Sequence, residues 1–264
     1  MLQTVMTQTV MTKILVCQPI FCPDQIRFER NVRSLTSLAQ YIQQYPYPIS
    51  FAFGGYSKDE FWESISQLIR DSFGVEPVRF PKNLGKASVV NSLLSNIDTP
   101  YILTCDSDIC FPLDEPRIFE RLIGLVETQP HIGLLALMQR EANCHDPSIY
   151  AHSEEVSGER LVWPSYPSGI AGGALFISTE AWRRTGYRVM GVYAGDDAYL
   201  LIDIHNLGYS IRVIDSLSII HPPDNDMVYA EWKKIVCHRD QSLLSSEDLE
   251  IRVQEADTFW NQPS

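Results

Sequence analysis

Strand-like and helix-like segments alternate along the first 110 residues of this 264-residue chain. Runs rich in β-branched and aromatic residues predict strands, and stretches with apolar residues at helical spacing follow them. The predicted strands are 13–18, 49–53, 75–80 and 101–105, and the predicted helices are 25–44, 59–73 and 85–96. We expect the first strand to end at Pro19 and the second to stop at Gly54-Gly55. This alternation predicts a parallel sheet with right-handed crossovers.

The second half of the chain is less regular. The predicted helices are 113–129, 179–185, 196–206 and 246–260, and the predicted strands are 132–140, 174–178, 211–214 and 217–220. The polar segment 141–159 has no clear periodicity and is expected to be a mobile loop, whereas 163–173 is rich in turn residues. We therefore divide the chain into a flexible leader (1–12), one domain (13–245, with halves 13–112 and 113–245) and a C-terminal helix and tail (246–264).

Charge and composition argue against several classes of protein. A net charge of −12 disfavours a general nucleic-acid binder, because phosphate contacts need a basic surface. The basic residues Arg27, Arg30 and Arg33, and the pair Lys233-Lys234, are expected to be solvated surface. No apolar run approaches the ~20 residues that span a bilayer. The N-terminus repeats QTVMT twice but lacks the charged and apolar regions of a secretory leader.

The cysteines indicate a reducing compartment. Their positions are Cys17, Cys22, Cys105, Cys110, Cys144 and Cys237, a spacing that fits neither a zinc ribbon nor a redox motif. Four of them lie in or beside apolar runs, where cysteine behaves as a small buried hydrophobe. Without a secretory leader, we expect reduced thiols and a cytoplasmic location.

Two acidic residues stand at the end of the fourth predicted strand, in the stretch YILTCDSDICFP. Asp106 and Asp108 project the same way from an extended segment, and without a counter-charge they repel each other. A divalent cation such as Mg²⁺ or Mn²⁺ removes that repulsion and keeps coordination positions open for phosphate oxygens. The alternative is a solvated turn that caps the following helix. The first interpretation is favoured because ligands bind at the carboxyl ends of parallel strands.

Four blocks of the sequence, taken together, resemble a known family. They are RFPKNLGKASVVNSLL, YILTCDSDICFP, GIAGGALFISTEAWRRTGY and GDDAYLLIDIHNLGYSIRVI. In this order they resemble the GT-A nucleotide-sugar glycosyltransferases of family 2, over roughly residues 13–222. The resemblance implies an α/β, Rossmann-like GT-A fold, with a mixed, mostly parallel sheet flanked by helices. It also implies that 13–112 is the nucleotide-binding half and 113–245 the acceptor half.

The resemblance also implies roles for individual residues. Asp106 and Asp108 form the D-x-D motif that holds the metal and the donor diphosphate, and His221 stands where some members place a further metal ligand. The residues matched to donor-binding positions are Pro19, Asn83, Gly85, Lys86, Asn91, Asp106, Ser107, Gly172 and Gly173. In the run Gly195-Asp196-Asp197, the resemblance implies that Asp197 is the catalytic base, with Asp196 beside it.

Physical chemistry is consistent with these roles. A cation neutralises the departing diphosphate, and the attacking hydroxyl needs a carboxylate within hydrogen-bond reach. The alternative for Asp196 and Asp197 is that both only favour the dipole of the helix they begin. For the acceptor we name Trp163, Tyr166 and Trp182, because aromatic faces suit sugar rings, although residues of this kind more often pack in the core or rim. The segment 141–159 is a candidate lid over the donor.

Two positions depart from the family pattern. Gly54-Gly55 occupies the end of the second strand, where the family places an acid that reads the nucleotide base, and Asp59 lies too far along to replace it. The first strand ends in CQPIFCPDQ, of which only Pro19 matches the family. The Gln-x-x-Arg-Trp block of processive polysaccharide synthases is absent from the sequence, which favours transfer of single sugars.

The sequence therefore predicts a metal-dependent, inverting glycosyltransferase that takes a nucleotide-diphosphate sugar as donor. The acceptor hydroxyl could belong to a saccharide, a protein, a small molecule or a modified nucleic-acid base. One alternative is a non-catalytic nucleotide- or sugar-binding protein of the same fold. A phosphatase-like hydrolase with Asp106 as nucleophile is a further alternative, but such enzymes usually place the acidic pair after the first strand. A nucleotidyltransferase would need a glycine-rich loop after strand one, which QPIFCPDQ does not supply.

Overall fold

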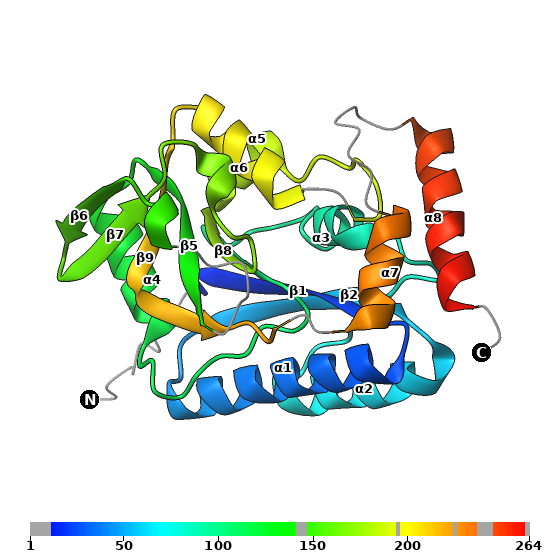
Figure 1. The fold of residues 1–264 in the computed structure, drawn as a ribbon. Coiled ribbons are helices and arrows are strands. Elements are labelled where there is room, and N and C mark those ends of the chain that lie inside the picture. Colours follow the sequence, from blue (N-terminus) through cyan, green and yellow to red (C-terminus); the bar gives the residue numbers. More distant parts are fainter. Residues whose placement is uncertain (1–11, 141–146, 194–195, 224–225, 237–244, 262–264) are drawn as a thin grey trace, which may run out of the picture.

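A nine-stranded mixed sheet organises the chain, in the strand order β3-β2-β1-β4-β8-β5-β9-β7-β6 (Figure 1). The computed structural model describes residues 12–140, 147–193, 196–223, 226–236 and 245–261. The strands are β1 (Ile14–Cys22), β2 (Ile49–Ser57), β3 (Val78–Arg79), β4 (Tyr101–Cys105), β5 (Ile132–Arg140), β6 (His152–Val156), β7 (Glu159–Trp163), β8 (Ala174–Ser178) and β9 (Ser210–Ile220). β1 to β4 pair in parallel, and β8 and β7 run against the other strands of the described sheet.

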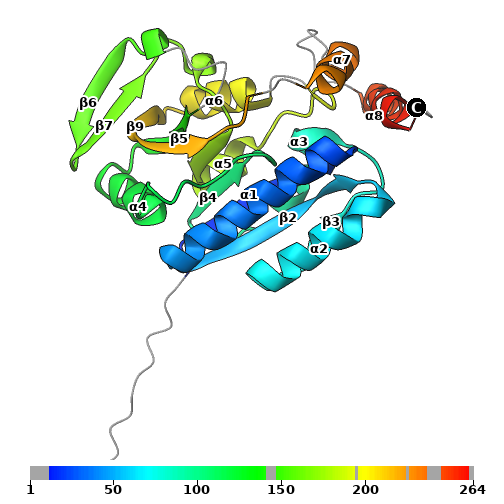
Figure 2. The same ribbon diagram turned by 60° about the horizontal axis from the view of Figure 1, so that its bottom comes forward.

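Helices cover both faces of the sheet. They are α1 (Gln25–Gln44), α2 (Asp59–Phe73), α3 (Gly85–Leu93), α4 (Ile118–Thr128), α5 (Thr179–Thr185), α6 (Asp196–Asn206), α7 (Met227–Val236) and α8 (Ser246–Trp260), with short 3₁₀ turns at Pro147–Ile149 and Pro167–Gly169. The apolar residues of α1, α2 and α4 form one core with the sheet, and those of α3, α5 and α6 form a second core on the opposite face (Figure 2). The α/β architecture with helices flanking a mixed sheet is as predicted.

The predicted ends of the first two strands are wrong. β1 continues past Pro19 to Cys22, and β2 continues through Gly54-Gly55 to Ser57. Proline is tolerated there because β4 pairs with β1 only as far as Cys17, so one edge of β1 is free of ladder bonds at Pro19. A Cβ atom at Gly55 would lie 2.0 Å from the carbonyl oxygen of Ile20. Glycine at position 55 therefore allows the backbones of β1 and β2 to lie close together where they run toward the cavity described below.

The prediction that 141–159 is a mobile loop is also wrong for the part of this segment that the structure describes as strand. Residues 152–163 form the antiparallel hairpin β6–β7, whose two-residue turn is Ser157-Gly158. Both turn residues have positive φ, 54° and 82°, as a type I′ hairpin turn requires. The dipeptide Ser-Gly was therefore the sequence signal for the hairpin. Residues 141–146 lie outside the described part of the chain.

Other differences concern element length. β3 is only Val78–Arg79, α3 ends at Leu93, and α4 begins at Ile118. The two strands expected over 211–220 are the single strand β9, whose register against β5 shifts between Leu137 and Met138. Helix α7 was not predicted. Within the described residues no helix is long and apolar enough to cross a membrane.

Four cysteines lie in the described residues, and all four are buried: Cys17, Cys22, Cys105 and Cys110. Burial raises the pKa of the thiols of Cys17, Cys22 and Cys105. They therefore act as small apolar side chains, in line with the sequence interpretation. Cys144 and Cys237 fall outside the described residues.

Candidate active site

A cavity of about 400 Å³ opens at the carboxyl ends of β1 and β4, beside the first turns of α3 and α6. It collects most of the residues singled out in the sequence: Pro19, Asn83, Gly85, Lys86, Asp106, Ser107, Asp108, Gly172, Asp196, Asp197 and His221. These residues are contributed by segments far apart in the chain. Their convergence follows from the parallel crossovers, which bring strand ends and helix starts to one edge of the sheet.

Lys86 joins the two acidic motifs. From the first turn of α3, its Nζ lies 2.6 Å from Asp106 Oδ1 and donates to Asp197 Oδ1 and Oδ2 at 2.8 and 3.0 Å. Burial alone would lower the pKa of the Lys86 ammonium, but Asp106 and Asp197 outweigh it and raise that pKa well above its ordinary value. A permanently charged ammonium is thus held between the D-x-D motif and the start of α6.

Asp197 is held from three directions. Besides Lys86, the Tyr187 hydroxyl donates to Asp197 Oδ1 at 2.8 Å. Burial raises the pKa of Asp197, while Lys86 opposes that rise. Gly172 lies against the same carboxyl group, since a Cβ atom there would be 2.0 Å from Asp197 Cγ. Tyr187 was missed by sequence reasoning because its role depends on a fold contact rather than on any motif.

Asn91 does not line the cavity. Its side chain donates to the Tyr187 carbonyl at 2.8 Å and accepts from the Tyr187 backbone N–H at 2.9 Å. The amide therefore fixes the segment that presents the Tyr187 hydroxyl to Asp197. Gly173 is also outside the cavity lining. Its carbonyl accepts the Asp106 backbone N–H at 2.8 Å, and a Cβ atom there would lie 2.6 Å from Gln139 Nε2.

Gly172→Ala is expected to lower activity by displacing the carboxylate of Asp197. The added methyl overlaps Asp197 Cγ, and misplacing a reacting group by about 1 Å can cost on the order of 10²-fold in rate. Gly124→Ala on α4 is the matched control, because nothing lies within 4 Å of the added Cβ. The measurement is turnover of both variants alongside their thermal unfolding. A fully active Gly172→Ala protein would contradict the close contact with Asp197.

Asp196 has a different environment from its neighbour. Burial, followed by the charge of Asp197, raises the pKa of Asp196 to about 8. The Ala87 backbone N–H in the first turn of α3 bonds to this carboxyl, whose Oδ1 has no partner among the described residues. At neutral pH Asp196 is therefore largely protonated and joins the starts of α6 and α3.

The raised pKa of Asp196 predicts a pH-dependent stability. Its contribution is fully present below the ordinary pKa of 3.8 and is lost as the pH rises through about 8. Over that window one proton accounts for about 1.4 kcal/mol per pH unit. Asp196→Asn mimics the protonated form, so its free energy of unfolding should fall less steeply than that of wild type between pH 5 and about 8. Parallel denaturant titrations measure this difference, and identical slopes would contradict the raised pKa.

Asp108 and His221 lie next to each other in the lining of the cavity. His221 Nε2 lies 3.9 Å from Asp108 Oδ1, and His221 Nδ1 lies 2.9 Å from the Pro222 carbonyl oxygen. Because a carbonyl can only accept, the neutral ring carries its proton on Nδ1 and turns the Nε2 lone pair toward the carboxylate. Two such groups at this separation fit a shared divalent cation, with the Nδ1–H held as in metal-binding histidines.

No group of three or more His, Cys, Asp or Glu side chains gathers as a metal site in the part of the chain that is described. Asp106, the other predicted ligand, is turned toward Lys86 instead. A cation here would have Asp108 and His221 as its protein ligands, which leaves the remaining positions to ligand oxygens. That division suits Mg²⁺ or Mn²⁺ beside a diphosphate.

Two arginines lie next to Asp108, and the expectation that they are solvated surface is wrong. Arg27 is only 4% exposed, and its Nη1 lies 3.9 Å from Asp108 Oδ2. Its guanidinium also contacts Asp226 and the ring of Tyr229. Arg30 Nη1 lies 3.7 Å from the same oxygen of Asp108. Helix α1 brings both residues to Asp108, because they lie about one turn apart on it, and Arg27 also lines the cavity.

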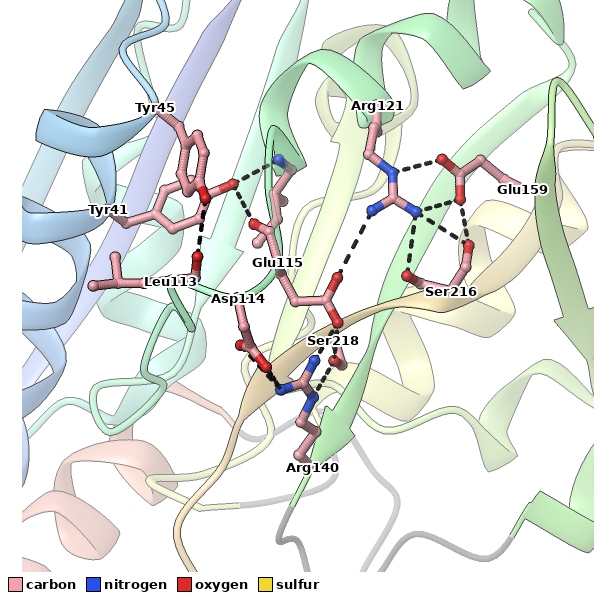
Figure 3. A network of polar contacts seen from close by, with 11 residues as sticks. Tyr41, Tyr45, Leu113, Asp114, Glu115, Arg121, Arg140, Glu159, Ser216 and Ser218 are labelled. Carbon is pink, nitrogen blue, oxygen red and sulfur yellow. Dashed lines mark hydrogen bonds and ion pairs between the residues drawn. The ribbon is translucent and has the colours of Figure 1, made fainter.

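A polar network holds the segment that follows Asp108 against β5 and β9 (Figure 3). Glu115 accepts from Arg140 and from Ser218 Oγ, and Arg121 Nη1 lies 3.7 Å from it. Tyr41 donates to the Glu115 carbonyl at 3.0 Å. The Arg140 carbonyl in turn accepts the His221 backbone N–H at 3.0 Å. The network therefore ties the segment after the D-x-D motif to β5 and to β9, the strand that His221 follows.

The three residues named for the acceptor lie outside this cavity. Trp182 is 5% exposed and packs edge-on against Tyr187 in the core, so its ring is not available to a ligand. Tyr166 is 78% exposed on the surface. Trp163 lines a second hollow of about 270 Å³, where its ring contacts His152 and Arg212. Ile170 lines both hollows.

The cavity is lined by a residue from near the end of β2, where the family pattern would place an acid. Tyr56 of β2 lines it, whereas Asp59 is exposed and paired with Arg79. Asp59 therefore does not take the place of the expected acid. The sequence analysis also missed the aromatic and basic residues that α7 and the segment before α6 contribute, namely Tyr193, Tyr229, Trp232 and Lys233.

Comparisons with known proteins identify the family of this chain. The family described as "Glycosyl transferase family 2" matches residues 30–175, which is more than half of the chain. None of the curated proteins matches the sequence significantly.

Solved structures share the fold at low sequence identity. S. aureus TarS 1-349 superposes with a TM-score of 0.59 at 12% identity, over 94% of this chain and 72% of that one. The same TarS fragment in complex with UDP-GlcNAc gives 0.58 at 11%, over 89% and 61%. The mannosyltransferase PcManGT from Pyrobaculum calidifontis, in complex with GDP-Man and Mn²⁺, gives 0.58 at 14%, over 95% and 70%. These structures confirm the expected GT-A fold.

Proposed function

Because this chain belongs to glycosyltransferase family 2, we propose that it moves one sugar from a nucleoside-diphosphate sugar to an acceptor hydroxyl, with inversion at the anomeric carbon. The observation that carries the proposal is the cavity in which Asp106, Lys86 and Asp197 are in contact beside Asp108 and His221. Its volume of about 400 Å³ lies in the range of small-molecule and cofactor sites.

The donor diphosphate lies beside Asp108 and His221, which would hold a divalent cation. When bound, that cation supplies charge neutralisation to the departing diphosphate. Arg27 and Arg30 add fixed positive charge at the same place. Lys86 and Ser107 also line the cavity, and Lys86 contacts both Asp106 and Asp197. The transferred sugar is assigned to the space between the diphosphate and Asp197.

Asp197 accepts the proton of the attacking hydroxyl. The new bond forms between that oxygen and the anomeric carbon as the bond to the diphosphate breaks on the opposite side. Burial raises the pKa of Asp197, which makes its carboxylate a better proton acceptor. Lys86 and the Tyr187 hydroxyl orient the carboxylate, and Gly172 leaves room for it.

The acceptor approaches from the side of Ile170, the residue that the reaction cavity shares with the hollow beside Trp163. We keep Trp163 as an acceptor contact on this ground and remove Trp182, which is buried. The acceptor class stays as broad as the sequence leaves it: saccharide, protein, small molecule or modified nucleic-acid base.

Donor hydrolysis tests the proposal without knowledge of the acceptor. The purified protein is incubated with UDP-, GDP-, CDP- and TDP-sugars plus Mn²⁺, and release of each nucleoside diphosphate is followed. We expect slow release from one donor class, because water can replace the acceptor hydroxyl. Tight binding of a donor without any release would indicate a non-catalytic binding protein instead.

A further inference from the structure

An aromatic wall closes one end of the cavity, and much of it comes from α7. The wall consists of Phe21, Tyr193, Tyr229 and Trp232, all of which line the cavity. The Tyr229 and Trp232 rings stack with centroids 5.2 Å apart, and Phe21 and Tyr193 lie 5.3 and 5.9 Å from Trp232. Figure 1 shows α7 and α8 side by side at the end of the molecule toward which β1 and β2 run.

Three of the four wall residues, Phe21, Tyr229 and Trp232, belong to or pack against a separate small core rather than the two cores of the sheet. That core contains Val192, Trp232, Val236, Val253, Ala256 and Trp260, with Phe21, Leu84 and Tyr229 packed against it. Helices α7 and α8 both follow residue 175, where the family match ends. This end of the cavity is therefore built by a part of the chain that the family match does not cover.

Two buried donors at this cavity lack partners. Trp232 Nε1 and Asn83 Nδ2 make no hydrogen bond to any described residue, although Trp232 is 2% and Asn83 6% exposed. Asn83 Oδ1 is already used, because it accepts the Gly85 backbone N–H at 3.1 Å. An indole N–H and an amide NH₂ can only donate, so both await acceptor atoms. A ligand with oxygen or nitrogen acceptors satisfies them.

The composition of the wall selects the ligand chemistry. Flat aromatic side chains stack on nucleobases of any identity, which strengthens binding by about 5- to 150-fold per base. Two cations also contact the wall, since Arg27 lies 3.5 Å and Lys233 Nζ 4.4 Å from the Tyr229 ring centroid. A planar, acceptor-bearing group attached to an anion matches all three features. A nucleoside diphosphate is such a group.

We propose that the α7 aromatic wall holds the donor nucleobase, with the Trp232 indole N–H donating to an acceptor atom of that base. The assignment rests on the proposed function, because it names the part of the donor that this end of the same cavity recognises. It also gives a physical answer to the missing acid at Gly54-Gly55. In this assignment the base is recognised by stacking and by a neutral donor on α7, instead of by an acid at the end of β2.

The test separates the base from the diphosphate. Calorimetry in Mg²⁺ measures the affinity of wild type and Trp232→Phe for UDP, GDP, CDP, TDP and inorganic pyrophosphate. Phenylalanine keeps an aromatic ring but removes the N–H. We expect about 10-fold weaker binding of the preferred nucleoside diphosphate, the usual value of one hydrogen bond, and unchanged binding of pyrophosphate.

Trp260→Phe is the matched control. Its indole N–H is also buried without a partner among the described residues, and it belongs to the same small core, but it does not line the cavity. We expect Trp260→Phe to bind every ligand as wild type does. Tyr193→Ala is a second variant with little risk of unfolding, since Tyr193 is 37% exposed, and it should lose stacking affinity for the nucleotide alone.

The possible outcomes are distinct. Equal affinity of Trp232→Phe and wild type for the nucleotide overturns the assignment and leaves the transferase proposal standing. Equal loss of pyrophosphate and nucleotide affinity also overturns it, because the effect would then arise from distortion of the diphosphate site. Failure of wild type to bind any nucleoside diphosphate overturns both proposals.

Discussion

Asp197→Asn should lower the rate of sugar transfer about 10²- to 10⁴-fold, the usual contribution of a general base. Asparagine keeps the shape of the side chain and its contact with Tyr187 but accepts a proton far less readily. Lys86 retains Asp106 as a partner, so the fold and the donor affinity should change little. Single-turnover rates with the preferred donor, together with the affinity for its nucleoside diphosphate, measure the two effects separately.

Asp203→Asn is the control for this variant. Asp203 lies on the same helix, is paired with Arg188, and does not line the cavity. The same chemical change there should leave the transfer rate within about twofold of wild type. A normal transfer rate in Asp197→Asn would remove Asp197 from the role of base.

Asp108→Asn should weaken binding of Mn²⁺ in the presence of the nucleoside diphosphate by at least about 100-fold. Loss of an outer-shell partner alone typically costs about 10- to 100-fold in metal affinity, and Asp108 is assigned as a direct ligand. Titration of Mn²⁺ into the protein–nucleotide mixture, followed by electron paramagnetic resonance, measures the affinity. His221→Ala should weaken binding in the same direction.

Asp106→Asn distinguishes this arrangement from a D-x-D motif in which both acids bind the metal. The Asp106 carboxyl lies 2.6 Å from the Lys86 ammonium, so its replacement should reduce Mn²⁺ affinity by less than about 10-fold. If Asp106→Asn loses the metal while Asp108→Asn keeps it, the assignment of ligands given above is wrong.

The fold was largely predictable because its signals are local. Periodicity placed α1, α2, α5, α6 and α8 and the strands β4, β5 and β8 at their observed bounds. The errors fall where pairing partners decide the outcome. The extension of β1 past Pro19 depends on where β4 stops, and the single strand β9 depends on a shift of register against β5.

The candidate site was predictable in part for a similar reason. Residues in recognisable blocks, such as Asp106, Asp108, Lys86 and Asp197, converge on one cavity. Contacts between distant segments gave no sequence signal. The Tyr187 hydroxyl reaches Asp197 only because Asn91 fixes its backbone.

Arg27, on helix α1, is a further residue whose position depends on contacts with distant segments of the chain. Its charge and its basic neighbours predict a surface position, but Asp226, Tyr229 and Asp108 from other parts of the chain contact it. The aromatic wall could not be predicted from the sequence either. Helix α7 was not predicted, and its Trp232 ring contacts Phe21 only in the folded protein.

In the proposed function, the cavity binds a nucleoside diphosphate together with a divalent cation. The most direct test is calorimetric titration of UDP-, GDP-, CDP- and TDP-sugars into the wild-type protein, once with Mn²⁺ and once with a chelator. We predict that one nucleotide class binds with Mn²⁺ and that the chelator weakens this binding by more than about 10-fold, because a cation held by Asp108 and His221 would neutralise the charge of the diphosphate. Absence of binding by every nucleotide in the presence of Mn²⁺ would contradict the account.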